Sequence, residues 1–436
     1  MKTKEHQLDL SWLEAYRSQD PHFGLERMEA LLALRGNPHL DCRVIHVAGT
    51  NGKGSTIATL SQLLRQAGLR IGVFTSPYLI QYNDQIMING EAISDQDLQT
   101  YLDSYHQLLK AEQSSTIFQG LTEFEVMTAI AYDYFAHEEL DYVIMEVGMG
   151  GRLDSTNVCQ PVLTAITSIG LDHVALLGPD LASIAREKAG IIKPEIPLVL
   201  GKLEPEASQV IEDIALQKKA PITAYDKDYQ VELEASRLSG QSFSYYSSKR
   251  EKASYQVALL GHHQARNAAL AISICDELFE REGRGHLSKE LVDEALRQVV
   301  WPGRMEVISQ KPMILLDGAH NPHAVAPLIA SLRELFPSQK KTILFTCIRT
   351  KALEEMLEQW QKLENSRLVL TTFDDPRAYS QDKMTAVANK HQLEEVDWRE
   401  FLQNWQAGDD ELLVVTGSLY FLSQVRPYLL KTEKSN

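Results

Sequence analysis

Glycine, lysine and hydroxyl residues lie together between an expected strand and an expected helix. Residues 49–56 read GTNGKGST, after an apolar run at 44–48 and before apolar residues at helical spacing over 57–64. Glycines let backbone N–H groups approach phosphate oxygens, the helix N-terminus adds positive potential, and Lys53 adds a full charge. This order of strand, glycine loop, lysine and helix predicts a site for the phosphates of a nucleotide.

The loop departs from the usual Walker A pattern. Val47 stands where that pattern has glycine, and Gly54 follows the lysine directly, so that Ser55 and Thr56 come one and two residues late. The alternative interpretation is a strand-to-helix turn that uses glycine only for its backbone angles. The flanking strand and helix favour phosphate binding.

A carboxylate ends another expected strand, at 142–146. Ligands bind beyond the carboxyl ends of strands in an open parallel sheet, so Glu146 falls where a magnesium ion beside a phosphate needs an anionic oxygen. The alternative is a strand-end glutamate that faces water. The glycine-rich stretch 147–154 that follows indicates either backbone close to a ligand or a flexible loop.

Four further residues stand at strand ends. Ser76 can offer a hydroxyl to a metal, or be a turn residue before a proline. His173 is as well explained by a structural hydrogen bond as by metal ligation. Asp317 and His320 form a candidate binding site, unless they belong to a turn that leads into a helix capped by Asn321. A charged run around Lys188 indicates, by itself, only a solvated helix face.

The elements that position these residues alternate between strand and helix, which predicts α/β architecture with mostly parallel sheets. A chain of 436 residues exceeds one ordinary core. We therefore expect a P-loop-type domain at 1–300, with a small antiparallel β element near 222–258, a hinge at 301–304, and a second, Rossmann-like α/β domain at 305–436. Expected strands and helices lie at 44–48, 70–74, 142–146, 162–167, 197–201, 313–317, 342–346, 367–371 and 412–416, and at 53–67, 95–111, 123–137 and 263–281.

Composition limits the function classes. The net charge of −16 argues against broad binding to nucleic acid or to anionic membranes. The four cysteines show no CxxC pair, which is typical of reduced thiols in the cytoplasm. The first residues lack the apolar core of a signal peptide, and no apolar run reaches the roughly 20 residues of a membrane helix. We expect a cytoplasmic monomer that acts on small molecules.

Taken together, the motifs resemble the folylpolyglutamate synthase/dihydrofolate synthase family of the Mur ligase superfamily. The matching strings run from residue 22 to residue 421, in order: HFGLERM (22–28), HVAGTNGKGST (46–56), TSPYL (75–79), EVGMGGRLDSTN (146–157), SIGLDH (168–173), REKAGI (186–191), GHHQARNAALAI (261–272), WPGR (301–304), LDGAHNP (316–322) and TGSLYF (416–421).

This resemblance implies roles for individual residues. ATP contacts are implied for Asn51, Gly52, Lys53, Gly54, Ser55, Asn267, Arg304 and Asp317. Magnesium ligands are implied to be Ser76, Glu146, His173 and a carbamylated Lys188, with a monovalent cation such as potassium as a further cofactor. Pteroate-binding segments are implied at Gly24, Leu25, Glu26, Arg27, Thr122, Glu123, Phe124, Glu125, Leu153, Asp154 and Ser155. His320 and Ser418 are implied to bind glutamate, with Lys53, Lys188 and His320 as the catalytic residues.

The activity implied is ATP-dependent addition of L-glutamate to folates, or to dihydropteroate, through an acyl phosphate. Residues 1–300 would then bind ATP and residues 305–436 would form the glutamate-ligase domain. Two alternatives are a Mur-type amino-acid ligase and a P-loop ATPase that acts as a regulatory module. One stretch, 346–351, reads TCIRTK where relatives carry a loop richer in glycine and aspartate, which affects the expected recognition of the amino acid.

Overall fold

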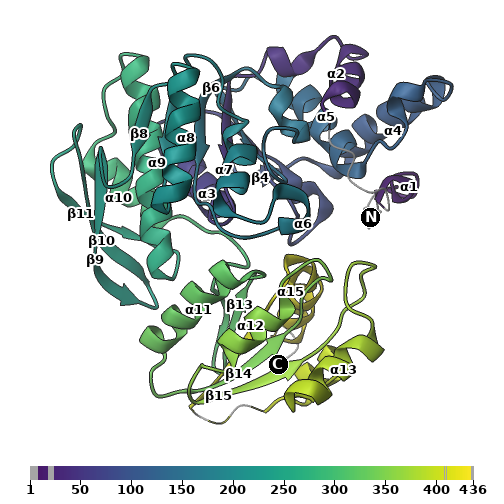
Figure 1. Ribbon diagram of the computed structural model, residues 1–436, viewed down its shortest axis with the longest axis vertical. Coiled ribbons are helices and arrows are strands. Elements are labelled where there is room, and N and C mark those ends of the chain that lie inside the picture. Colours follow the sequence, from purple (N-terminus) through teal and green to yellow (C-terminus); the bar gives the residue numbers. More distant parts are fainter. Residues whose placement is uncertain (1–7, 18–23, 407, 409, 434–436) are drawn as a thin grey trace, which may run out of the picture.

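Three sheets form the framework of the computed structural model, which describes residues 8–17, 24–406, 408 and 410–433 (Figure 1). The largest has eight strands in the order β4-β3-β2-β5-β1-β6-β7-β8. All neighbours in it are parallel except β3, which is antiparallel to both β2 and β4. The strands are β1 (Val44–Ala48), β2 (Ile71–Phe74), β3 (Ile86–Ile88), β4 (Glu91–Ala92), β5 (Tyr142–Glu146), β6 (Pro161–Ile166), β7 (Leu198–Leu200) and β8 (Ile222–Ala224).

Strand β1 lies in the middle of this sheet, between β5 and β6. Its register pairs Ile45 with Ile144 on one side and with Leu163 on the other. All five residues of β1 are buried, as is normal for a parallel strand covered by helices on both faces. Parallel pairing also brings the carboxyl ends of β1, β2, β5 and β6 to one edge, where the residues predicted to do chemistry follow.

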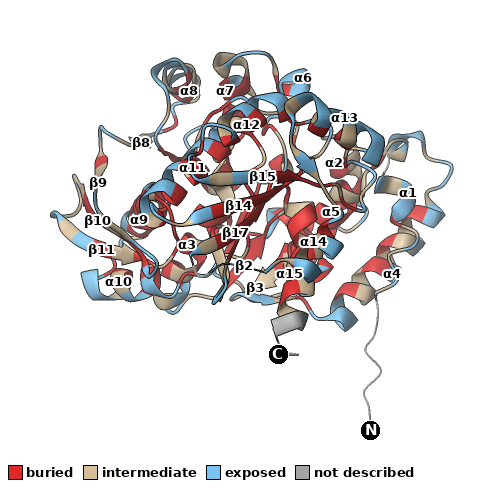
Figure 2. Cartoon of the chain, turned by 90° about the horizontal axis from the view of Figure 1, so that it is seen from below, coloured by how far each residue is buried: buried red, intermediate tan, exposed pale blue. Residues whose placement is uncertain are grey.

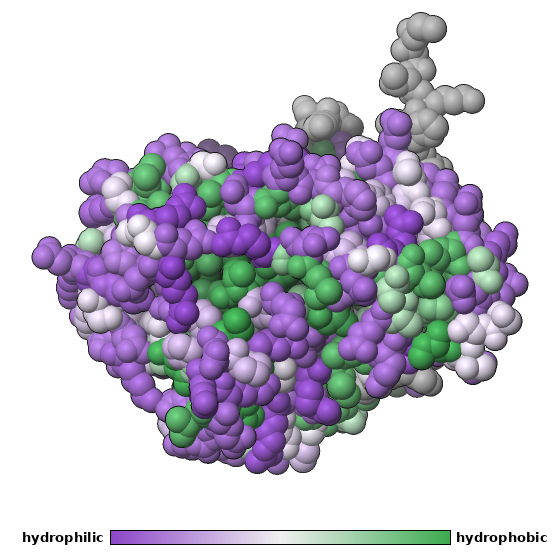
Figure 3. Space-filling model, turned by 90° about the horizontal axis from the view of Figure 1, so that it is seen from above, coloured by the Kyte–Doolittle hydropathy of each residue, from purple (hydrophilic) through white to green (hydrophobic). Residues whose placement is uncertain are grey.

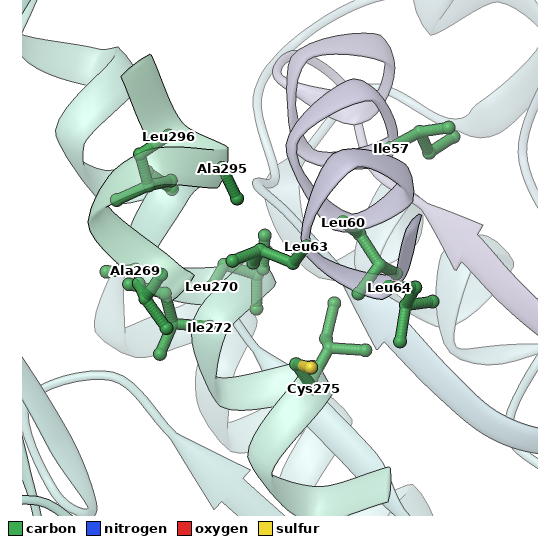
Figure 4. Close-up of a cluster of buried hydrophobic side chains, with 14 of the residues drawn as sticks. Ile57, Leu60, Leu63, Leu64, Ala269, Leu270, Ile272, Cys275, Ala295 and Leu296 are labelled. Atoms are coloured by element: carbon green, nitrogen blue, oxygen red, sulfur yellow. The ribbon is translucent and has the colours of Figure 1, made fainter. Parts of the chain in front are cut away.

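Helices cover both faces of the eight-stranded sheet. They are α1 (Glu14–Arg17), α2 (Glu26–Ala33), α3 (Lys53–Gln66), α4 (Asp95–Ala111), α5 (Glu123–Ala136), α6 (Val174–Leu177), α7 (Leu181–Ala189), α8 (Pro205–Gln217), α9 (His262–Arg281) and α10 (Lys289–Arg297). The apolar face of α3 packs against α9 and α10 (Figure 4). Leu60 and Leu63 of α3 belong to the same buried cluster as Leu270 and Leu296, so the helix that follows the glycine loop is packed on its apolar face.

The small antiparallel sheet is separate from the large one, with β9 (Tyr229–Arg237), β10 (Gly240–Ser247) and β11 (Ala253–Val257) in the order β11-β10-β9. The boundary of 222 expected for this element is wrong, because β8 at 222–224 pairs in parallel with β7. Among the described residues, no strand of the small sheet pairs with a strand of the large one. The small sheet packs instead against α9.

Residues after 305 form a second layered unit, in the lower half of Figure 1. Its sheet has the order β12-β13-β17-β14-β15-β16, parallel except for the antiparallel edge strand β12. The strands are β12 (Glu306–Gln310), β13 (Met313–Asp317), β14 (Lys340–Phe345), β15 (Ser366–Leu370), β16 (Glu394–Glu395) and β17 (Glu411–Thr416). The helices are α11 (Pro322–Leu335), α12 (Leu353–Trp360), α13 (Gln381–His391), α14 (Trp398–Asn404) and α15 (Leu419–Glu433). The α/β fold with mostly parallel sheets in two units is confirmed.

Burial follows the layers. The inner strands are red and the outward helix faces pale blue in Figure 2. The face in Figure 3 is mostly hydrophilic, and apolar side chains gather on it only in separate areas. Within the described ranges, no helix combines the length and the apolar character needed to cross a bilayer.

His46 on β1 gives a testable pH dependence of stability. Its side chain is fully buried, with Nε2 2.8 Å from Thr156 Oγ1 and Nδ1 3.8 Å from Cys159 Sγ. Burial, followed by the charge of Lys193, lowers the pKa of His46 to about 3 from 6.5. Below pH 6.5 the unfolded chain therefore binds a proton at His46, whereas the folded protein binds that proton only near pH 3. The contribution of His46 to the free energy of unfolding is fully present above pH 6.5. At lower pH this contribution decreases by about 1.4 kcal/mol per pH unit.

Urea denaturation at pH 6.5 and pH 5 measures this slope. Replacing His46→Gln should reduce the slope of unfolding free energy against pH by the amount that one bound proton contributes. This holds whatever the variant's absolute stability. Equal slopes in the two proteins would contradict the assignment.

Candidate functional site

A cavity of about 1140 Å³ lies between the two layered units, where the carboxyl ends of both sheets face one another. Most of the predicted site residues line it: Gly24, Asn51, Gly52, Lys53, Gly54, Ser55, Ser76, Thr122, Glu123, Phe124, Glu125, Glu146, Leu153, Asp154, Ser155, His173, Lys188, Asn267, Arg304, Asp317, His320 and Ser418. The chain thus brings together residues that are up to several hundred positions apart.

The segment around Gly24 contributes less to the cavity than the other predicted segments. Leu25, Glu26 and Arg27 do not line it. Instead, Arg27 Nε donates to Glu125 Oε1 at 2.8 Å, which joins α2 to α5 behind the cavity wall. Residues 22 and 23 of the HFGLERM string lie outside the described residues.

Backbone geometry at the glycine loop explains two of its glycines. Gly52 is the N-cap of α3 with φ of +83°, and a Cβ there would come within 2.6 Å of Asn267 Oδ1. A Cβ on Gly54 would meet Trp301 Nε1 at 2.7 Å. With glycine as its N-cap, α3 has no capping side chain, so its first N–H groups are available to an anion from the cavity. Ser55, at the start of α3, also lines the cavity.

Two lysines converge on one carbonyl oxygen of this loop. Lys53 Nζ donates to Gly49 O at 3.1 Å, and Lys188 Nζ donates to the same oxygen at 3.0 Å. Lys188 is only 4% exposed. Burial and the neighbouring Lys53 lower the pKa of Lys188 to about 7. A large fraction of Lys188 is therefore the neutral amine near neutral pH, the form able to react with carbon dioxide.

Glu146 ends β5 beside these lysines. Its carboxylate is 6% exposed, and the nearest ammonium is Lys53 Nζ at 3.8 Å. Burial raises the pKa of Glu146, against the opposing effects of Lys53 and Arg304. The Glu146 carboxylate and the Ser76 hydroxyl line the same cavity. Together they offer the oxygen donors that magnesium prefers.

His173 is engaged differently from the other predicted metal ligands. Its Nε2 lies 3.1 Å from Lys351 Nζ, so it accepts a hydrogen bond from that ammonium. Burial and Lys351 lower the pKa of His173 to about 4, which keeps the imidazole neutral. The residues of the described ranges contain no cluster of three or more His, Cys, Asp or Glu that could hold a metal. A metal site here would accordingly use Glu146, the Ser76 hydroxyl and phosphate oxygens. His173 could act as a further ligand only after its hydrogen bond from Lys351 is broken.

The end of β13 and the loop after it carry the predicted residues Asp317 and His320 to the cavity. Asp317 ends β13 and its carboxylate accepts from Met305 N at 2.9 Å and Ala319 N at 2.8 Å, so it holds the backbone on either side. His320 Nδ1 donates to Gly318 O at 2.7 Å, which leaves the Nε2 lone pair available. Burial and Lys351 lower the pKa of His320 to about 3. A pKa this low keeps the imidazole neutral and makes it a weak base, so Nε2 is available as a hydrogen-bond acceptor for an amine.

The predicted pteroate residues at 122–125 and 153–155 form another part of the cavity lining. Thr122 and Glu125 make a capping box at the start of α5, which fixes Phe124 against the backbone of Gly148. Asp154 is 7% exposed, and its carboxylate accepts from Met149 N at 2.8 Å and from Thr156 Oγ1 at 2.5 Å. Asp154 therefore shapes the glycine-rich loop after β5. An aromatic ring beside a polar wall suits a flat heteroaromatic ligand.

Sequence reasoning missed three residues that meet at the centre of the interface between the units. Asp172, Asn321 and Lys351 are hydrogen-bonded to one another through Asp172. Asn321 is also the expected helix cap, because its side chain accepts from Ala324 N at the start of α11. The available signal was that Asp172 and Lys351 each stand shortly after a strand at the carboxyl edge of its sheet.

Comparison with known proteins agrees with this architecture. Residues 47–275 match the Mur ligase middle domain, and residues 303–419 match the glutamate ligase domain of Mur ligases. The fold and the cavity between its two units thus define a Mur ligase.

A relative from Bacillus subtilis (strain 168), a dihydrofolate synthase/folylpolyglutamate synthase, is 38% identical over 96% of this chain and 98% of its own. The Mycobacterium tuberculosis folylpolyglutamate synthase complexed with ADP superposes with a TM-score of 0.85 at 28% identity, covering 96% of each chain. A solved FPGS–AMPPCP–folate complex superposes with a TM-score of 0.83 at 32% identity, covering 97% of this chain and 98% of that one. The chain belongs to the folylpolyglutamate synthase/dihydrofolate synthase family, as its motifs predicted.

Proposed function

We propose that this protein is an ATP-dependent ligase that adds L-glutamate to folates and releases ADP and phosphate. One observation carries the proposal beyond family membership. A single cavity connects the lysine-bearing glycine loop, the wall formed by Phe124 and Asp154, and the loop that holds His320. A nucleotide, a flat acceptor and an amine therefore have separate walls of one cavity.

The chemistry requires such a space. A carboxylate is a poor electrophile, because its charge is delocalised and oxide is not a feasible leaving group. An oxygen of the folate carboxylate attacks the γ-phosphorus of ATP, the bond to ADP breaks, and an acyl phosphate forms. The glutamate amine then attacks the acyl carbon, loses a proton, and expels phosphate. Water must be kept out, because it would hydrolyse the acyl phosphate.

Residues of the first unit would hold the nucleotide. Lys53 and the N-terminus of α3 would bind phosphate oxygens, and Asn267, next to Gly52, would contact the nucleotide from α9. Glu146 and Ser76 would hold magnesium, with a carbamylated Lys188 as a further acidic ligand. Magnesium, when bound, neutralises charge on the transferring phosphoryl group, and a potassium ion is a further candidate cofactor.

Residues of the second unit would complete the reaction. Arg304 and Asp317 would contact ATP from the far side, and Ser418 with His320 would bind glutamate. His320 Nε2 would accept a hydrogen bond from the glutamate amine and orient it for attack, because the carboxylate of Asp317 is already engaged by two backbone N–H groups. In this proposal 301–304 is the hinge, 1–300 and 305–436 are the domains, and the enzyme acts as a monomer on small molecules.

The test is a ligation assay with the purified protein. It is incubated with ATP, magnesium and L-glutamate, and with tetrahydrofolate or dihydropteroate as acceptor, and the product mass is read directly. We expect one glutamyl residue added for each ADP released, with no product when acceptor or glutamate is omitted. ADP release that ignores glutamate would favour a P-loop ATPase instead. Ligation of glutamate only to a nucleotide-linked peptide would favour a Mur-type peptide ligase.

Replacing Glu146→Gln is expected to raise the magnesium concentration for half-maximal ligation by at least about tenfold, because the buried site loses its charged ligand. Magnesium titration of the rate measures this, and titration of magnesium binding by calorimetry with ADP present gives a readout independent of activity. Glu138→Gln, which removes a carboxylate paired with Arg70 at the surface, is the matched control. Unchanged magnesium dependence in a folded Glu146→Gln protein would contradict the assignment.

A further inference from the structure

Asp172 is a largely buried carboxylate that the mechanism above does not use. It follows β6 at the carboxyl edge of the eight-stranded sheet, and its side chain is 10% exposed. Its two oxygens have different partners: Oδ1 accepts from Lys351 Nζ at 2.7 Å, and Oδ2 accepts from Asn321 Nδ2 at 3.0 Å. Oδ1 also accepts from the backbone N–H of His173 at 2.9 Å, within its own unit. Both side-chain partners belong to the other layered unit, so Asp172 spans the interface.

Each partner anchors a different loop of the six-stranded sheet. Asn321 precedes α11 and caps it, and Lys351 lies in the loop after β14 with its side chain only 4% exposed. Such buried opposite charges depend on each other, because removal of one leaves the other without compensation. Asp172 therefore fixes two loops of the second unit against one point of the first.

The connection continues to the phosphate loop. Asn321 Nδ2 donates to Asn51 Oδ1 at 3.1 Å, and Asn51 Nδ2 donates to Asn321 Oδ1 at 3.2 Å, so the two carboxamides face one another. His320, the neighbour of Asn321, has Nε2 3.9 Å from Asp172 Oδ2. One hydrogen-bonded chain thus runs from Lys351 through Asp172 and Asn321 to the loop that carries Lys53.

We propose that Asp172 is a positioning residue for ligation, which sets the loops of His320 and Lys351 in register with the phosphate loop. This inference rests on the proposed function. The groups proposed to bind the phosphates and magnesium lie mainly in the first unit, whereas attack by the amine needs both units in place. Without Asp172, phosphoryl transfer continues but the acyl phosphate is exposed to water. Water then attacks it, the carboxylate is regenerated and phosphate leaves, so ATP is consumed without ligation.

The test compares the wild type with Asp172→Asn, which keeps the shape but loses the charge that pairs with Lys351. We expect Asp172→Asn to bind ATP with an affinity within about twofold of the wild type. We expect its ligation rate to be lower by about 100-fold, with more than one ADP released per glutamate incorporated. Glu212→Gln, which removes a surface carboxylate 2.8 Å from Lys227, is the matched control and should keep a ratio of one. Wild-type ligation with an unchanged ratio in Asp172→Asn overturns this inference alone, whereas absence of ligation by the wild type overturns the proposed function.

A second variant, Asn321→Asp, tests the same contact from the other side. This variant keeps a side-chain oxygen that can cap α11. It also places a second carboxylate beside that of Asp172, so the two negative charges repel each other across the interface. We expect the same uncoupling, and partial recovery in the double variant Asp172→Asn/Asn321→Asp, where amide and carboxylate are exchanged. Strictly additive losses in the double variant contradict a direct role for the contact. Loss of the fold in every variant, seen by circular dichroism, would make Asp172 a structural residue and overturn the proposal.

Discussion

Replacing Lys53→Ala is expected to lower kcat/KM for ligation by about 10³-fold or more while the protein remains folded. Lys53 lies at the start of α3, is held by Gly49 O at 3.1 Å, and stands 3.8 Å from the Glu146 carboxylate. Its ammonium is therefore placed where charge on the transferring phosphoryl group must be neutralised, and alanine removes the whole charge. Steady-state ligation kinetics and ATP binding by calorimetry measure the effect.

Two controls separate this role from a general effect of lost charge. Lys110→Ala removes an exposed lysine at the end of α4 and should ligate normally. Lys53→Arg keeps the charge but changes its shape, and should recover only part of the activity, because the guanidinium is larger and planar. Normal ligation by a folded Lys53→Ala protein would remove the phosphate-binding role from the glycine loop.

Replacing Lys188→Ala should cause a loss of similar size, about 10³-fold, that excess bicarbonate cannot restore. The physical reason is the environment of the amine, which is 4% exposed and beside Lys53 and has a pKa lowered to about 7. The neutral amine attacks carbon dioxide, a proton leaves the nitrogen, and a carbamate forms that carries an anionic oxygen toward the metal site. Alanine has no nitrogen on which this acid can form.

The carbamate can be observed apart from activity. Protein equilibrated with ¹³C-bicarbonate should show a carbamate carbon signal by NMR that is absent in Lys188→Ala. Lys193→Ala is the matched control, since Lys193 is a nearby, partly buried lysine that donates to Asn157 O instead. Full activity of Lys188→Ala would show that carbamylation is dispensable in this enzyme.

Local sequence patterns predicted much of the fold. The run 44–48 and the apolar residues after Lys53 became β1 and α3, because burial of a parallel strand and of a helix face leaves direct traces in residue spacing. The predictions failed where pairing is not local. The strands β3, β4, β12 and β16 were not predicted, and β8 was assigned to the wrong sheet. Strands of two to five residues carry little periodicity and choose their partners by tertiary packing.

The candidate site shows the same division. The sequence by itself determined the chemistry present: a glycine loop with Lys53, a carboxylate at the end of β5, and a histidine after β13. Backbone and side-chain chemistry at these points depends on near neighbours, so spacing reveals it. The resemblance added roles for distant residues such as Lys188, whose charged surroundings indicated only a solvated surface.

Only the tertiary structure decided which of these groups meet. Lys188 reaches Gly49 across 139 residues, and Lys351 reaches Asp172 across 179. Both lysines are buried, in contrast to the exposed positions that their residue type favours. The Lys188 contact forms within the first unit, where the fold of the eight-stranded sheet places α7 beside the loop after β1. The Lys351 contact crosses between the units, because the two sheets dock with their carboxyl edges together around these charges. No local periodicity encodes that docking, since its energy comes from surfaces that form only after each sheet is complete.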